Sequence, residues 1–139
     1  MLIIVSLLWA GALLGGSFIA APAKFRVESL DLAQLLAVGQ AQFQALALTE
    51  VVLASCMIVT TIWARPAMWY LILIPLAIFA LQQSVIYPPL DARTAARIAG
   101  EPVSESNLHL VYVALEAAKF LSLIVVAAFC RMSKDRIIA

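Results

Sequence analysis

Four long hydrophobic stretches, separated by short polar segments, follow one another along the chain. We expect membrane-spanning helices at about residues 2–21, 40–62, 67–87 and 108–130. A helix needs about 20 mostly apolar residues to cross the hydrocarbon core of a bilayer, and each stretch meets that requirement. The pattern predicts an all-α fold, an integral membrane four-helix bundle in a single domain over residues 1–139. Four crossings place both termini on the same side of the membrane.

The first stretch carries no charged residue between Met1 and Ala21. A cleaved signal peptide is the alternative, because Ala21-Pro22-Ala23 resembles a cleavage site. The basic leading segment is missing, however, and the apolar run exceeds the usual ~7–15 residues, so we expect a retained span. Within it, Gly11 and Gly15 have a GxxxG spacing, which favours close helix packing inside the chain.

The second stretch is longer than one span requires, running from Leu32 to Trp63 with Glu50 as its only charge. We expect a long helix with Ser29 or Asp31 near its N-terminus, a polar first part at the membrane interface and a bend at Gly39. In the third span a kink is expected at Pro75, about midway. Pro88-Pro89 should end that span and open a polar loop over residues 88–107, in which residues 91–99 favour a short surface helix.

The fourth stretch carries a polar stripe on one helical face. At about 100° per residue, His109, Tyr112, Glu116 and Lys119 fall within a sector of about 80°. Ionisable groups at membrane depth are costly and generally face protein or water, so we expect this stripe to point into the bundle. Glu116 and Lys119, three residues apart, are placed either to neutralise each other or to act in a site.

Topology brings polar groups of three spans into the same half of the membrane. The second span begins, the third ends and the fourth begins on the side of the two polar loops, so their hydrogen-bonding groups should meet in a shared vestibule. Glu50 is expected to be protonated or ion-paired, with Lys119 as one possible partner. The alternative is a structural network that only holds the helices together. The predicted site for a solute or a proton comprises Gln40, Gln44, Glu50, Gln83, His109, Tyr112, Glu116 and Lys119.

Composition agrees with a membrane protein and narrows the possible chemistry. The chain is 65% hydrophobic and 12% charged, with a mean hydropathy of +1.04, against about 25% charged residues in soluble domains. A net charge of +1 offers no surface for nucleic acid. Cys56 and Cys130 lie in hydrophobic runs without CxxC spacing, and we interpret them as core residues. With one histidine and no nucleophile or phosphate-loop motif, the sequence identifies no catalytic residue, metal site or cofactor. An enzyme is the less favoured class.

Orientation in the membrane is not decided by the Lys and Arg count. Arg65, Arg131, Lys134 and Arg136 lie on the terminal side, and Lys24, Arg26, Arg93 and Arg97 on the other, so the counts are equal. The compact basic tail favours termini on the inside. We expect a multi-pass protein of a bacterial inner membrane or an organelle membrane, in contact with lipid and forming a homo-oligomer or part of a larger membrane complex.

Four segments, GGSFIAAPAKF, AVGQAQF, YPPLDARTAARIAG and SNLHLVYVALE, carry a resemblance to a known family. Together they resemble the transmembrane protein 205-like family of small four-span membrane proteins. The matching positions are Gly15, Phe18, Phe25, Pro89, Arg93 and His109, whereas Glu50 and the Glu116/Lys119 pair have no assigned place in the family pattern. The resemblance implies a four-span fold and, through links to drug or metal tolerance, membrane handling of solutes.

The sequence thus favours one function and leaves two others open. The favoured function is binding or passage of a small solute, ion or proton through the vestibule. The first alternative is a non-catalytic accessory subunit whose polar stripe docks on a partner. The second is a membrane enzyme acting on a lipophilic substrate. An inward orientation of the stripe across a cavity would favour the first function.

Overall fold

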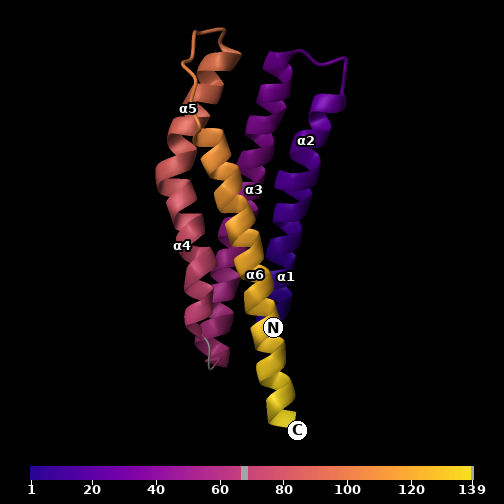
Figure 1. The fold of residues 1–139 in the computed structure, drawn as a ribbon, viewed down its shortest axis with the longest axis vertical. Helices are drawn as coiled ribbons and strands as arrows, with labels where there is room; N and C mark the ends of the chain where they lie inside the picture. The colour runs from indigo at the N-terminus through magenta and orange to yellow at the C-terminus, as the bar shows by residue number, and fades with distance from the viewer. Residues whose placement is uncertain (67–68, 139) are drawn as a thin grey trace.

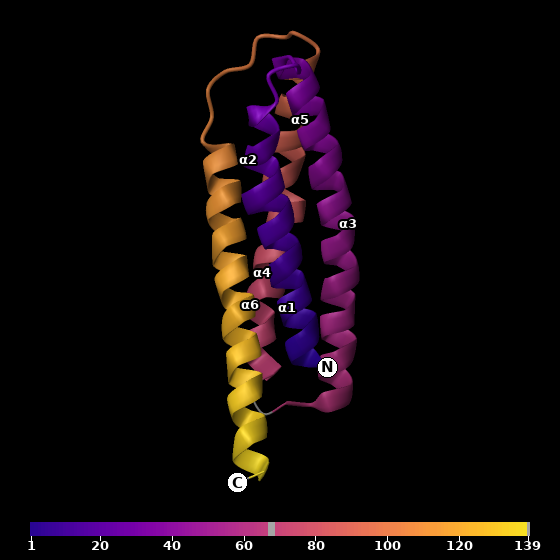
Figure 2. The ribbon, with the colours of Figure 1, turned by 90° about the vertical axis from the view of Figure 1, so that its right-hand side faces the viewer.

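The described residues form a bundle of four long helical rods, and both termini lie at one end of it (Figures 1 and 2). The computed structural model describes the backbone of residues 1–66 and 69–138, and the side chains of residues 1–66 and 69–132. Four helical stretches are long and apolar enough to cross a membrane: Leu2–Arg26, Leu32–Ala64, Trp69–Ile98 and Leu108–Met132. The predicted all-α membrane bundle is therefore confirmed. The predicted start of the third span, residues 67 and 68, and the side chains of Lys134 and Arg136 lie outside the described residues.

The rods are assembled from several helical segments. The first rod comprises α1 (Leu2–Leu13), the π-helical η1 (Leu14–Ala20), α2 (Ala21–Ala23) and the 3-10 segment η2 (Lys24–Arg26), and the second is α3 (Leu32–Ala64). The third comprises the 3-10 segment η3 (Trp69–Ile72), α4 (Leu73–Leu81), the π-helical η4 (Gln82–Ile86) and α5 (Tyr87–Ile98), and the fourth is α6 (Leu108–Ile138). α1 packs against α6 and α3, while α6 contacts α4 and α3 contacts α5.

Local chemistry sets the ends of α3. The Asp31 carboxylate accepts a hydrogen bond from the Gln34 backbone N–H at 2.8 Å, and the Gln34 side chain accepts one from the Asp31 N–H at 3.0 Å. This reciprocal capping box satisfies two backbone donors that would otherwise have no partner, and it confirms Asp31 as the N-cap. At the other end Arg65 adopts a left-handed conformation with φ of 42°, and its N–H bonds the Thr61 carbonyl.

Two rods continue through prolines beyond their predicted ends, although Pro88-Pro89 was expected to end the third span. The first rod passes Pro22 and ends at Arg26, and the third passes Pro88-Pro89 and ends at Ile98. Each proline follows a π-helical segment and lies in the first turn of the next α-helix. A proline is tolerated there because its missing N–H and its ring no longer conflict with a regular α-helical turn. The polar loop is accordingly shorter than predicted, and residues 91–99 extend the third rod instead of forming a separate surface helix.

Other packing predictions need correction. Pro75 lies in the first turn of α4 rather than midway along its rod. Gly11 and Gly15 face open space, whereas a Cβ at Gly16 would contact Leu46, so a neighbouring glycine makes the close approach. At Gly39, where a bend was predicted, α3 is a continuous helix. An added Cβ at this position would collide with the Lys24 ammonium of the first rod. Cys56 is exposed on the outer surface and is not a core residue.

The bundle has two halves of different character. Apolar side chains fill the terminal half, near both chain ends, with Trp9, Met57 and Leu123 fully buried and Val5 and Val126 close to it. The loop-side half, beneath the two polar connections, contains a pocket and most of the polar side chains that cross between helices. Many large apolar side chains face outward along all four rods, as expected for contact with lipid.

Candidate functional site

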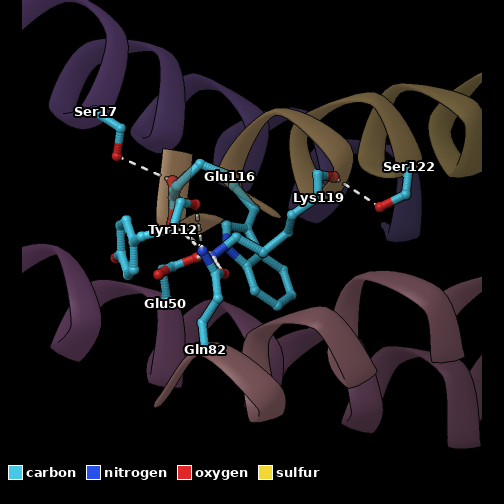
Figure 3. A network of polar contacts seen from close by, with 8 residues as sticks. Ser17, Glu50, Gln82, Tyr112, Glu116, Lys119 and Ser122 are labelled. Carbon is cyan, nitrogen blue, oxygen red and sulfur yellow. Dashed lines mark hydrogen bonds and ion pairs between the residues drawn. The ribbon is translucent and has the colours of Figure 1, made fainter. Parts of the chain in front are cut away.

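A buried ion cluster lies between the two halves (Figure 3). The Lys119 ammonium makes ion pairs with Glu50 of α3 and with Glu116 of its own helix, the latter with 3.0 Å between Nζ and Oε1. The side chains of Lys119 and Glu50 are completely buried and that of Glu116 is nearly so. The orientation predicted for the polar stripe is therefore confirmed for Tyr112, Glu116 and Lys119, which all point into the bundle.

Neutral polar side chains from the first and third rods complete the ion cluster. The Trp9 indole N–H donates to Glu50 Oε1 at 2.8 Å, and the Ser17 hydroxyl donates to Glu116 Oε2 at 2.9 Å. The Gln82 amide accepts from Lys119 at 2.7 Å and donates to Glu116 Oε1 at 3.1 Å. We use the term ion cluster for these six residues, which come from all four rods: Trp9, Ser17, Glu50, Gln82, Glu116 and Lys119.

The ion cluster has one more acidic group than basic groups. Glu50 and Glu116 contribute two carboxylates and Lys119 one ammonium, so the fully ionised cluster has a net charge of −1. Glu50 Oε2 is buried and has no hydrogen-bond partner among the described residues. A net charge in an apolar interior costs several kcal/mol, so the extra carboxylate requires a proton or a cation.

A pocket of about 430 Å³ extends from the ion cluster toward the loops. Its inner end is formed by Ser17 and Glu116, and its outer end by Lys24, Thr94 and His109. Aromatic rings line much of the wall between these ends. They are contributed by every rod: Phe18, Phe25, Phe43, Tyr87 and Tyr112. Pockets of 300–1,000 Å³ with apolar walls and a few polar groups are typical of sites for small molecules.

Polar contacts along the pocket wall connect the helices. Asp91 of α5 accepts hydrogen bonds from the Gln40 amide at 2.8 Å and from the Tyr87 hydroxyl at 3.3 Å. The Lys24 ammonium lies 5.3 Å from the ring centre of Phe25 and 5.8 Å from that of Phe43. These distances fall in the range of cation–π contacts. Apart from Glu116 at the inner end, the pocket lining therefore has one carboxylate, Asp91, and one ammonium, Lys24.

The predicted site residues divide into three groups. Glu50, Tyr112, Glu116 and Lys119 come together at the centre, where the Tyr112 ring packs edge-to-face on Phe43 with 5.6 Å between ring centres. Gln40 and His109 line the pocket, although His109 is largely exposed at the outer end.

Two predicted glutamines lie outside the ion cluster. Gln44 is exposed, and Gln83 has a buried amide nitrogen without a hydrogen-bond partner among the described residues. The third rod contributes Gln82 where the sequence predicted Gln83. Gln82 is the first residue of η4 and continues the inward face of α4, because the inward-facing Pro75 and Phe79 lie seven and three residues before it.

Three residues of the ion cluster were not among the site residues predicted from the sequence. Trp9 and Ser17 lie in a span without charges, which gave no reason to place polar groups opposite Glu50 or Glu116. The available signal was the indole N–H, because a buried tryptophan usually needs an acceptor and Glu50 is the only charge in the neighbouring span. Gln82 lies next to the predicted Gln83 at the polar end of the third span.

The positions that carry the family resemblance are scattered over the loop-side half. Phe18 and Phe25 line the pocket, and Phe18 also packs against Phe120 with 6.2 Å between ring centres. Arg93 donates to the Ser104 carbonyl and so ties α5 to the following loop. Gly15 and Pro89 face outward.

Comparisons with known proteins identify no relative of the chain. No family model, no curated protein and no solved structure matches the chain. The resemblance to the transmembrane protein 205-like family therefore stays a prediction. Within the part of the chain that the structure describes, no group of three or more His, Cys, Asp or Glu residues is arranged to hold a metal ion.

Proposed function

We propose that the protein binds a small, mostly apolar solute in the loop-side pocket, with the ion cluster at the inner end of the site. The observation that supports this most directly is the aromatic-lined pocket of about 430 Å³ that ends on the Glu116 carboxylate. Apolar walls favour a lipophilic ligand, and a single charged group at the inner end would orient it.

The inward direction of the polar stripe favours this function over docking on a partner. Tyr112, Glu116 and Lys119 are buried and hold contacts within the chain, so they are not presented to another protein. Binding would be the first step of passage across the membrane. The apolar packing of the terminal half closes the far side in this conformation, so passage would require the helices to rearrange. Kinship with the transmembrane protein 205-like family, which we propose on the sequence resemblance, agrees with handling of solutes.

Photolabelling in lipid nanodiscs tests the proposed function. A small neutral probe, 3-trifluoromethyl-3-phenyldiazirine, should label pocket residues such as Phe18 and Tyr112 in a saturable manner. Excess neopentylbenzene should suppress that labelling, whereas labelling of outward-facing Leu121 should follow the probe's lipid concentration and resist competition. Peptide mapping by mass spectrometry separates the two classes.

A pocket-filling variant provides the control for this experiment. Val113 lines the pocket, so Val113→Trp should occupy the space and abolish saturable labelling while leaving labelling at Leu121 unchanged. Labelling that follows lipid exposure alone, with no competition at Phe18 or Tyr112, would show that the pocket binds no such solute.

A further inference from the structure

We propose that the ligand of the pocket is an organic ammonium ion, and that its binding releases one proton held by the ion cluster. This inference rests on the proposed function, because it requires a ligand in the pocket. It adds the ligand's chemical class and the exchange of the ligand for a proton. Two independent features carry it: the charge balance of the cluster and the aromatic lining of the pocket.

The first feature is the missing positive charge. The described groups around the cluster are Trp9 and Ser17 on the first rod, Glu50 on the second, Gln82 on the third, and Tyr112, Glu116 and Lys119 on the fourth. Among these side chains Lys119 is the only cation, and it serves two carboxylates. Farther out, Lys24 and Asp91 have opposite formal charges and His109 is exposed. Without a ligand, electroneutrality in the apolar interior requires one proton on the carboxylates. Glu50 Oε2 can take this proton, because it accepts no hydrogen bond from another described residue.

The second feature is the aromatic wall, which selects the charge type of the ligand. Ring faces attract cations through their quadrupole, and aromatic cages bind quaternary ammonium groups. The pocket already accommodates one ammonium in this way, because Lys24 Nζ lies over Phe25 and Phe43. Lys119 repeats the arrangement at the cluster, with its Nζ 5.5 Å from the ring centre of Phe79. A ligand ammonium that reached the inner end would meet the Glu116 carboxylate beside Tyr112.

The exchange is balanced in atoms and charge. In the empty state, one proton is bound at Glu50 Oε2, and the cluster is neutral. When an ammonium ion arrives at Glu116, the Glu50 O–H bond breaks and the proton leaves to water. The ion then supplies the positive charge that the proton had supplied. No covalent bond to the ligand forms and no redox partner is needed.

An isosteric pair of probes tests the inference. Benzyltrimethylammonium and neopentylbenzene have nearly the same shape and differ in one positive charge. Isothermal titration of the full chain in nanodiscs, repeated in buffers of different ionisation enthalpy, counts the protons released on binding. We expect proton release with the ion, approaching one per bound ion, and none with the neutral probe. The affinity for the ion should rise with pH, because a smaller fraction of the clusters then holds a proton that the ion must displace.

Two variants and one control locate the source of the proton. Glu116→Gln and Glu50→Gln each leave one carboxylate for Lys119, so the cluster is neutral without a bound proton. Both should lose proton release and the pH dependence, and should bind the ion about tenfold or more weakly. Glu105→Gln removes the same charge from the exposed loop and should behave as wild type. Helical circular dichroism and size-exclusion elution verify that each variant folds.

The possible outcomes separate this inference from the proposed function. Binding of both probes with no proton release and no pH dependence would overturn the exchange and leave solute binding intact. Proton release that persists in Glu50→Gln and Glu116→Gln would also overturn it, because the cluster would not be the source. Binding of neither probe, together with non-saturable photolabelling, would remove the proposed function itself.

Discussion

The terminal half and the loop-side half of the bundle are made from the same four rods, yet their interiors are filled differently. In the terminal half Trp9, Met57 and Leu123 are fully buried against one another and their apolar neighbours. In the loop-side half the rods leave a pocket of about 430 Å³ and connect through hydrogen bonds such as that from Gln40 to Asp91. One half therefore serves as a packed anchor, and the other retains space at a cost in packing.

The difference originates in the helical geometry as well as in the side chains. Both π-helical segments, η1 and η4, lie in the loop-side half or at its boundary, and each is followed by a proline. η1 contributes Ser17 and Phe18 to the site, and η4 contributes Gln82. π-helical turns inside α-helices frequently occur at functional sites. In the terminal half the first rod is regular α-helix, whereas α3 and α6 are α-helical through both halves.

The largest effect is expected from removing the cation that joins the two halves. Lys119→Met keeps a long side chain but leaves two buried carboxyl groups without their cation. Removing one partner of a buried ion pair costs about 3–5 kcal/mol, so the free energy of unfolding in mixed micelles should fall by that amount. The double variant Glu50→Gln/Lys119→Met should recover part of the loss, because it leaves one carboxylate fewer. A double variant no more stable than Lys119→Met would show that the stranded charge is not the cause.

A smaller effect is expected from opening a cavity in the anchor. Leu123 is fully buried in the terminal half, whereas Leu121, two residues earlier on α6, is 61% exposed to the lipid side. Leu123→Ala should lower the free energy of unfolding by about 2 kcal/mol or more through lost packing contacts. Leu121→Ala should change it by less than about 0.5 kcal/mol, since its methyl groups face lipid rather than protein. Equal effects in the same unfolding assay would contradict the packed anchor.

The sequence predicted those features of the site that depend on regular helical geometry. On α6, an uninterrupted helix, the 3.6-residue period correctly placed Tyr112, Glu116 and Lys119 on the inner face. The pairing of Glu50 with Lys119 was foreseen as one option, because a buried charge in a chargeless neighbourhood needs a partner from another helix.

Prediction failed where the helical period changes. Proline is normally a helix-stop signal, and nothing in the local sequence around Pro22 or Pro88 marked the preceding turns as π-helical. The pocket itself was expected only as a vestibule, since its volume depends on how the side chains of four rods meet, which no single helix specifies.

The smallest and most local contrast is between two serines of the first rod. Ser17 lies at the inner end of the pocket, while Ser6 is fully buried in the terminal half, where its hydroxyl bonds the Leu2 carbonyl. In a Cys56→Ser/Cys130→Ser background, Ser17→Cys should react with the water-soluble cationic reagent methanethiosulfonate ethyltrimethylammonium at least about tenfold faster than Ser6→Cys. The reason is that reaction requires a thiolate that the reagent and water can reach. Benzyltrimethylammonium should slow the reaction at residue 17 and leave residue 6 unchanged. Equal rates at the two positions, measured by intact mass over time, would mean that the halves do not differ in access and that the pocket does not admit a cation from the loop side.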